Sequence, residues 1–137
     1  LGTIIRTVEA VGASGVAVTP HTVDPYNGKA VRGSMGSILR VPVVRIQNEH
    51  DFVVTCKARG FQAAALVLNG RVTPFELDLT VPTVIMVGQE SSGLMAEELA
   101  GFDHRIRIPM AETIDSLNVA TSSAVVLYEA LRQRMMR

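Results

Sequence analysis

The sequence predicts an α/β fold, with a mainly parallel sheet and helices on both of its faces. Short apolar runs alternate with longer amphipathic runs along the chain. The short runs are continuously apolar, which is typical of parallel strands that are covered on both sides. No internal repeat or linker divides the 137 residues, so we expect one domain spanning residues 1–137.

The first half of the chain shows local signals for three helices and two strands. Apolar residues at helical spacing predict the first helix, and Gly12 suits its C-terminal cap. Asn27 can cap the second helix, and Gly60 closes the third. In order, the expected elements are a helix at Gly2–Gly12, a strand at Gly15–Thr19, a helix from Asn27 to Met35, a strand at Val41–Ile46 and a helix at Glu49–Arg59.

The second half alternates in the same way. Ser116 is expected to cap the last helix, because its hydroxyl can accept a first-turn N–H. Asn118 would then lie inside the first turn, where asparagine is a mediocre helix former, and this favours a ligand contact. The expected elements are strands at Ala63–Leu68, Thr83–Val87 and His104–Ile108, a helix near Leu94–Leu99, a last helix from Ser116 and an irregular stretch at Arg71–Pro82.

Composition limits the classes of function. The 13 basic and 13 acidic residues cancel, which argues against a broad phosphate-binding surface. Eleven of the basic residues are arginine, whose planar fork suits specific phosphate contacts. The single cysteine, Cys56, excludes an internal disulfide and indicates a reducing, cytoplasmic location. No apolar run reaches the ~18 residues of a membrane span, so we expect no membrane partner.

Three polar or glycine-rich segments directly follow predicted strands. They are Asn69-Gly70, Gly88–Gly93 and Pro109–Asn118. Ligands of open α/β sheets bind beyond the carboxyl ends of the strands, so these segments are expected to converge on a site. The alternative for each is an ordinary turn. Glu90 could hold an amine, a hydroxyl or an arginine there, or be an exposed loop acid near a helix start.

The sequence lacks the motifs of metal sites and of several common classes of enzyme and nucleotide-binding protein. His21, His50 and His104 are scattered without metal-ligand spacing, so no metal is expected. The sequence contains no HExxH, CxxC, P-loop, GxGxxG or GxSxG pattern. Cys56 is interpreted as a packing residue. From the residues alone, the chain is an α/β ligand-binding domain whose site is built from its last two strand-end loops.

Three blocks, in the same order, resemble the signature motifs of the SpoU-type (TrmH-like) branch of the SPOUT RNA methyltransferases. The similarity covers essentially the whole chain, including an Arg-x-Ser-x-Gly helix at residues 32–36. The blocks are Gly2-Thr3-Ile4-Ile5-Arg6-Thr7 with Glu9, Ala10 and Gly12; Ile85 through Leu94; and Ile108-Pro109-Met110 with Asp115-Ser116-Leu117-Asn118-Val119, Leu127-Tyr128-Glu129-Ala130 and Arg132-Gln133.

The resemblance implies a C-terminal deep trefoil knot, an exception to the rule against threading. It also implies a homodimer whose protomers share each active site. The reaction would be methyl transfer from S-adenosylmethionine to a ribose 2′-hydroxyl of rRNA or tRNA. The positions that match the cofactor site are Leu68, Asn69, Gly70, Gly88, Ile108, Met110 and Leu117.

The same resemblance assigns catalytic roles to Arg6, Glu90, Ser116 and Asn118. We interpret Arg6 as a clamp on the hydroxyl and its adjacent phosphate, because a free arginine is a very poor base. Glu90 would hold Arg6 or Asn118, while Ser116 and Asn118 would shape the knot and substrate pocket. Arg6 is also a candidate RNA contact, and the further candidates are Arg32, Arg40 and Arg45.

One departure from the family pattern lies at the start of the sequence. The family's first motif begins with a strand and an asparagine just before the position of Leu1. We therefore expect a catalytic domain without its first strand and without any N-terminal RNA-binding extension. Two alternatives stay open: a non-catalytic SPOUT-like domain that binds cofactor or RNA, and a flavodoxin-like nucleotide binder, which needs a phosphate loop after the first strand.

Overall fold

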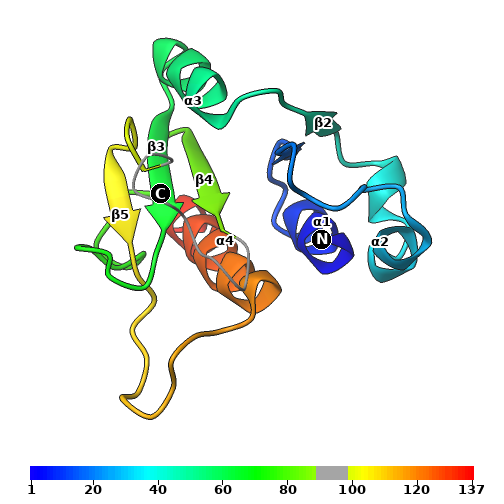
Figure 1. The fold of residues 1–137 in the computed structure, drawn as a ribbon. Helices are drawn as coiled ribbons and strands as arrows, with labels where there is room; N and C mark the ends of the chain where they lie inside the picture. Colours follow the sequence, from blue (N-terminus) through cyan, green and yellow to red (C-terminus); the bar gives the residue numbers. More distant parts are fainter. Residues whose placement is uncertain (89–98) are drawn as a thin grey trace. The chain divides into compact units, whose positions relative to one another are not determined.

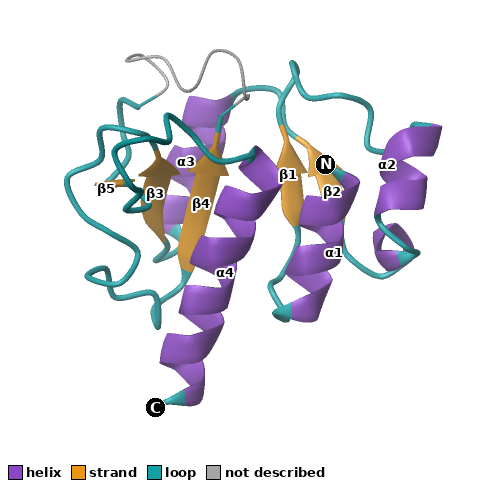
Figure 2. Cartoon of the chain, turned by 90° about the horizontal axis from the view of Figure 1, so that it is seen from below, coloured by secondary structure: helices purple, strands orange, loops and turns teal. Residues whose placement is uncertain are grey.

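The computed structural model describes residues 1–88 and 99–137. The chain forms two compact units, Leu1–Glu49 and His50–Arg137. Figures 1 and 2 show helices and strands alternating along the chain, as an α/β fold requires. Within the described residues, no helix combines the length and the apolar character needed to cross a membrane.

The unit Leu1–Glu49 contains three helical segments and a small parallel sheet. Strands β1 (Val16–Val18) and β2 (Val43–Arg45) pair in parallel, with Val16 opposite Val43. Gly12 has a φ of +68° after the first helix, so the predicted glycine cap is confirmed. Asn27 accepts the N–H of Ala30 at 3.0 Å and caps the second helix as predicted. The other elements are α1 (Gly2–Ala10), α2 (Gly28–Gly33) and the 3-10 helix η1 (Ser37–Leu39).

Helices α1 and α2 lie beside each other (Figure 1), and they touch at a point where only glycine fits. A Cβ added to Gly2 would lie 2.3 Å from the carbonyl oxygen of Ala30 and 2.8 Å from the amide nitrogen of Ser34. Both atoms belong to the backbone and cannot move aside locally. Because Gly2 has no side chain, the two helix backbones can touch directly, and the start of α1 is thereby fixed against α2.

The unit His50–Arg137 contains the larger sheet and the longest helix. Its described strands are β3 (Gln62–Leu66), β4 (Thr83–Val87) and β5 (His104–Ile106). They are parallel and lie in the order β4-β3-β5, which confirms the predicted parallel arrangement. Gly60 has a φ of +84° just after α3 (Glu49–Ala58), the helix that it was predicted to close. The described helices are α3, which begins at the unit boundary, and α4 (Val119–Met135).

The core of this unit lies around the central strand β3. Ala63, Ala64 and Ala65 are all completely buried. Because successive side chains point to opposite faces, both faces of β3 are covered, as the continuously apolar run predicted. Val126 of α4 packs in the same cluster, and Figure 2 shows α4 alongside β4 and β3. The buried cluster consists of Ala64, Leu77, Leu79, Ile106 and Val126.

The start of the last helix differs from the prediction, and another predicted helix falls mostly outside the described residues. The last helix begins at Val119 and its cap is Asn118, so the prediction that Ser116 caps it is wrong. Two candidate cap residues lie close together, and the structure uses the later one. The helix expected near Leu94–Leu99 falls almost entirely on residues 89–98, which lie outside the described residues.

Candidate functional site

The carboxyl ends of β3, β4 and β5 lie side by side at one edge of the sheet. Leu66 is in register with Val87 on one side and with Ile106 on the other. The chain leaves these three residues into the segments that carry Asn69-Gly70, Gly88 and Pro109. The three segments therefore start from one edge of the sheet, as predicted. Their convergence on a ligand site stays a prediction, and residues 89–93 of the second segment lie outside the described residues.

The segment after β3 is fastened to β5 on both sides of a short loop. The N–H of Val67 donates to the carbonyl of Ile106 at 2.9 Å, and the N–H of Arg71 donates to the carbonyl of Arg105 at 2.9 Å. Residues 68–70 lie between these bonds. Leu68 is 67% exposed and Asn69 is exposed beside it, whereas Gly70 is buried. The loop is thus anchored at both ends and offers an apolar side chain at its centre.

Gly70 closes this loop and is buried. An added Cβ would lie 2.5 Å from the carbonyl carbon of Ile106, 2.6 Å from the nitrogen of Arg107 and 2.8 Å from the oxygen of Arg105. All three atoms are backbone atoms at the end of β5. Only glycine lets the loop approach the neighbouring strand end this closely, so the identity of residue 70 fixes the shape of the site.

The opposite side of the edge is formed by the chain after β5. Ile108 is half-buried and packs against the core cluster, and Met110 is also half-buried. Leu117 is 36% exposed and Ser116 is exposed farther along the segment. Half-buried apolar side chains therefore lie on the chain that leaves β5, and ligand sites are lined mainly by apolar side chains with a few polar groups.

Asn118 has a clear structural role at the start of α4. Its side-chain oxygen accepts the N–H of Ala120 at 2.8 Å, and its carbonyl accepts the N–H of Ser122 at 2.9 Å. As the cap, Asn118 precedes the helix instead of lying within its first turn. Its poor helix propensity is therefore no longer an argument for a ligand contact, and its catalytic role stays a prediction from the resemblance.

Arg6 lies on α1 in the unit Leu1–Glu49. Ile5 and Val8 are buried and hold the helix, while Arg6 is exposed. Arg6 follows Gly2 by four residues, so it lies on nearly the same side of α1 as the contact with α2. No residue that the structure describes forms an ion pair with Arg6. Its proposed partner Glu90 lies outside the described residues.

Two of the predicted RNA-contact arginines are engaged with carboxylates. Arg40 binds Glu9 with two hydrogen bonds, one from Nε and one from Nη2 at 3.0 Å. This bonding lowers the pKa of Glu9 to about 2. Arg45 donates to Asp24 at 2.6 Å. Sequence reasoning missed both pairings, since each joins residues more than twenty positions apart.

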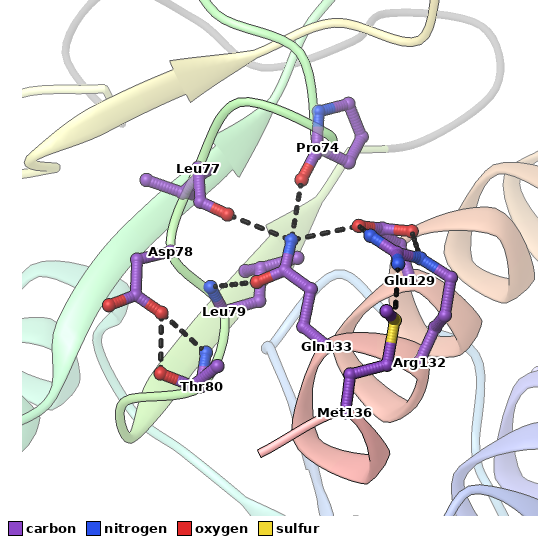
Figure 3. A network of polar contacts seen from close by, with 9 residues as sticks. All are labelled: Pro74, Leu77, Asp78, Leu79, Thr80, Glu129, Arg132, Gln133 and Met136. Carbon is purple, nitrogen blue, oxygen red and sulfur yellow. Dashed lines mark hydrogen bonds and ion pairs between the residues drawn. The ribbon is translucent and has the colours of Figure 1, made fainter.

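The structure also reveals an anchoring network that sequence reasoning missed (Figure 3). Gln133 of α4 donates to the carbonyls of Leu77 at 3.0 Å and Pro74 at 3.3 Å, and accepts the N–H of Leu79 at 2.8 Å. It also donates to the buried Glu129 at 2.8 Å. The network ties the β3–β4 connection to α4. The only hint of this network in the sequence was the presence of Arg132-Gln133 in the third block that resembles the family motifs.

Glu129 is the second member of this network. It is only 7% exposed, and Arg132 binds it through two hydrogen bonds of 2.7 and 2.8 Å (Figure 3). The hydrogen bonds from Arg132 lower the pKa of the Glu129 carboxyl, and the bond from Gln133 acts in the same direction. Glu129 is therefore held as a carboxylate and serves as a fixed acceptor for Gln133.

The chain matches known proteins over nearly its whole length. The model of the SpoU rRNA Methylase family matches residues 1–128. A 23S rRNA (uridine(2479)-2'-O)-methyltransferase of Streptomyces viridochromogenes is 36% identical over 140 residues, which cover 98% of this chain and 49% of that protein. A tRNA (guanosine(18)-2'-O)-methyltransferase of Escherichia coli (strain K12) is 41% identical, over 96% of this chain and 57% of that protein.

Solved structures agree with these sequence matches. The SpoU methyltransferase AviRb from Streptomyces viridochromogenes, crystallised with the cofactor AdoMet, superposes with a TM-score of 0.90 at 37% identity. The match covers 98% of this chain and 52% of that one. The chain thus spans about half the length of the curated relatives that it matches first. By the extent of the family match and the identity to these relatives, the chain belongs to the SpoU rRNA Methylase family.

Proposed function

We propose that this chain is the catalytic part of an RNA methyltransferase that transfers a methyl group from S-adenosylmethionine to a ribose 2′-hydroxyl of rRNA or tRNA. The observation that carries the proposal is the match, over 98% of the chain, to a SpoU methyltransferase solved with AdoMet. Two relatives that are named as 2'-O-methyltransferases, one of 23S rRNA and one of tRNA, support the same reaction.

The residues at the sheet edge fit S-adenosylmethionine. The cofactor has a flat adenine with apolar faces and a polar rim. Leu68 lies exposed on a loop that is fastened at both ends, and the missing Cβ of Gly70 lets that loop close on β5. Leu68, Ile108 and Leu117 would hold the adenine faces, while backbone groups of residues 69–70, Gly88 and Met110 would take its polar atoms.

When bound, the cofactor supplies a methyl group on a positively charged sulfur. The transfer is an in-line displacement, in which the bond from the 2′-oxygen to carbon forms as the carbon–sulfur bond breaks. Accurate positioning provides much of the rate of such a reaction. Arg6 presents up to five N–H donors, with which it would orient the 2′-hydroxyl and the adjacent phosphate. The same donors would stabilise the negative charge that develops on the 2′-oxygen as the hydroxyl releases its proton to solvent.

The remaining polar positions would support this arrangement. Glu90 would hold Arg6 or Asn118 in place. Ser116 would line the substrate pocket, and Asn118 would do so from the start of α4, where it caps the helix. Arg32 is the candidate phosphate contact that lies exposed on α2. Arg40 and Arg45 would contact RNA only by sharing or leaving their carboxylate partners.

The architecture of the active enzyme is part of the proposal. We expect the segment after β5 to complete a deep trefoil knot around the cofactor. The strand order β4-β3-β5, in which β5 pairs with β3 although β4 lies between them in the chain, is compatible with such a crossover. We further propose a homodimer with shared active sites, acting in the cytoplasm, where rRNA and tRNA substrates are modified.

Substitution of Arg6 tests the proposed role directly. In Arg6→Ala, binding of S-adenosylmethionine measured by calorimetry should stay within about twofold of the wild-type value, while methyl transfer falls by about a hundredfold or more. Arg59→Ala is the matched control, because Arg59 is also exposed and lies at the end of α3 outside the proposed site. Arg6→Ala with wild-type turnover would show that the assignment is wrong.

Mapping of ribose methylation identifies the substrate. The rRNA and tRNA of cells with and without this protein are compared nucleotide by nucleotide, and one 2′-O-methylated position should disappear with the protein. Calorimetry with S-adenosylmethionine and with FMN separates the alternatives. Binding of FMN alone would favour a flavodoxin-like nucleotide binder, and cofactor binding without any lost methylation would favour a non-catalytic domain.

A further inference from the structure

The zero net charge of the chain conceals an uneven distribution. The unit Leu1–Glu49 has five basic and three acidic residues, a net charge of +2. The unit His50–Arg137 has eight basic and ten acidic residues, a net charge of −2. A chain that is neutral as a whole therefore has one unit whose charge favours contact with an anionic polymer.

Three of the five basic residues in the unit Leu1–Glu49 form no ion pair with a described residue. Two carboxylates of the first unit are used by the Arg40–Glu9 and Arg45–Asp24 pairs. Within the part of the chain that the structure describes, neither Lys29 nor Arg32 has an ion-pair partner, and both are exposed on α2. Arg6 is the third, on the side of α1 that carries the contact with α2.

Tyr26 lies just before α2 and is 61% exposed. Its backbone is held on both sides, because its N–H donates to Asp24 at 3.2 Å and the next residue, Asn27, caps α2. Pro25, immediately before it, is fully buried. A large aromatic ring is thus presented to solvent from a fixed backbone, which reduces the entropy lost when a ligand stacks on it.

The guanidinium of Arg32 folds back along α2 and lies against Gly28. Its Nη1 lies 3.1 Å from the point where a Cβ of Gly28 would be, two residues after Tyr26. Because Gly28 has no side chain, the cation can occupy this space. An exposed ring and cations on one short segment are the combination that binds single-stranded nucleic acid, since bases stack on the ring and phosphates meet the cations.

We propose that Tyr26, Lys29 and Arg32 form a docking surface for an unpaired stretch of the RNA substrate, with a base stacked on the Tyr26 ring. The proposal rests on RNA being the substrate, as proposed above. Single-stranded RNA fits better than a duplex, because base faces are stacked inside an A-form helix and cannot reach a protein ring. Arg40 and Arg45 are not part of this docking surface, because their guanidinium groups bind the carboxylates of Glu9 and Asp24.

Fluorescence anisotropy with a labelled 12-nucleotide single-stranded RNA tests the docking surface without needing the natural substrate. Tyr26→Ala should weaken binding about tenfold, whereas Tyr26→Phe should stay near the wild-type affinity. Phe75→Ala is the matched control, because Phe75 is 58% exposed in the acidic unit, and it should not change binding. The same oligonucleotide in a duplex should bind more weakly and should not respond to Tyr26→Ala.

The salt dependence of binding separates stacking from phosphate contact. Arg32→Ala and Lys29→Ala should each reduce the slope of log K against log salt by about 0.7, the value for one phosphate of a single strand. Tyr26→Ala should leave the slope unchanged, because a stacked ring releases no counterions. Arg59→Ala controls for removal of an exposed charge elsewhere and should also leave it unchanged.

A tryptophan at position 26 gives a direct optical readout. The chain contains no tryptophan, so Tyr26→Trp places a single indole at the proposed platform. Its fluorescence should be quenched when the single-stranded RNA binds. Three results would each overturn the proposal: undiminished binding in Tyr26→Ala, absence of quenching in Tyr26→Trp, or a change of self-association in Tyr26→Ala without any change in RNA binding.

These readouts are independent of methyl transfer. If the proposed enzyme activity fails but the oligonucleotide binds in a way that depends on Tyr26, the docking surface stands and the domain is an RNA binder. If methyl transfer is found and Tyr26→Ala binds the oligonucleotide as the wild type does, the docking surface is wrong and the proposed function stands.

Discussion

The side chain of Gln133 contacts the backbone of Leu79, which precedes it by 54 residues, and accepts its N–H at 2.8 Å. Leu79 is completely buried, so its N–H has no access to water if this bond is lost. The same Gln133 amide also donates to the carbonyl of Leu77. One side chain of α4 thus satisfies polar groups of the connection that leads from β3 to β4.

Gln133→Ala is therefore expected to destabilise the unit His50–Arg137. The substitution leaves the Leu79 N–H and nearby carbonyls without partners, which should lower the free energy of unfolding by about 2–3 kcal/mol. Urea unfolding followed by circular dichroism measures the change. Arg137→Ala, at the exposed end of the chain, is the control; a loss below about 0.5 kcal/mol in Gln133→Ala would contradict the anchoring role.

The pairing of Glu9 with Arg40 predicts a pH dependence in the unit Leu1–Glu49. The pKa of Glu9 is lowered from 4.5 to about 2, chiefly by the hydrogen bond from Arg40. Its contribution to stability is therefore fully present above pH 4.5 and is lost as the pH falls toward 2. Unfolding midpoints of the wild type and Glu9→Gln should converge over that range. A difference that stays constant from pH 6 to pH 2 would argue against the pair, and added salt should shrink it.

Gly70→Ala should impair the cofactor site more than the fold. The added Cβ would lie 2.5 Å from the carbonyl carbon of Ile106, so the loop of residues 68–70 must shift away from β5. We expect about tenfold weaker binding of S-adenosylmethionine in calorimetry, because small displacements of positioning groups are costly. Gly60→Ala is the control: Gly60 has a φ of +84° but nothing within 4 Å of its added Cβ, so it should lose stability and keep its cofactor affinity.

Gly2→Ala should disturb Arg6 through the helix that carries it. The new methyl group would meet the Ala30 carbonyl at 2.3 Å and would force α1 away from α2. We expect about 2 kcal/mol of destabilisation from the overpacked helix contact. Turnover should fall at saturating S-adenosylmethionine. Unchanged turnover together with lowered stability would show that the position of α1 does not limit catalysis.

Two substitutions of Asn118 separate its cap from its proposed catalytic role. Asn118→Ala should cost about 1 kcal/mol of stability, because the N–H of Ala120 loses its acceptor. Asn118→Asp keeps the acceptor and should retain the stability of α4. If Asn118 touches the substrate through its amide, methyl transfer falls in both variants; if it acts only as a cap, Asn118→Asp retains wild-type turnover.

Local patterns were enough to predict most elements of this fold. The apolar run Thr83–Val87 has the same bounds in the sequence and in the structure, and Asn27 caps α2 as its residue type indicates. Continuous apolarity also predicted parallel strands buried on both faces, as Ala63 to Ala65 show. These features depend on side-chain type and spacing over a few residues, which the sequence displays directly.

The sequence by itself therefore determined the elements, their parallel pairing and the family, and with the family the positions proposed for cofactor and substrate. Only the tertiary structure decided that Arg40 and Arg45 bind carboxylates, and that Asn118, not Ser116, caps α4. Only it showed that Gly70 must be glycine to meet Ile106. Each of the long-range contacts joins residues that are distant in the chain, and packing sets their approach, whereas periodicity and propensity act only between near neighbours.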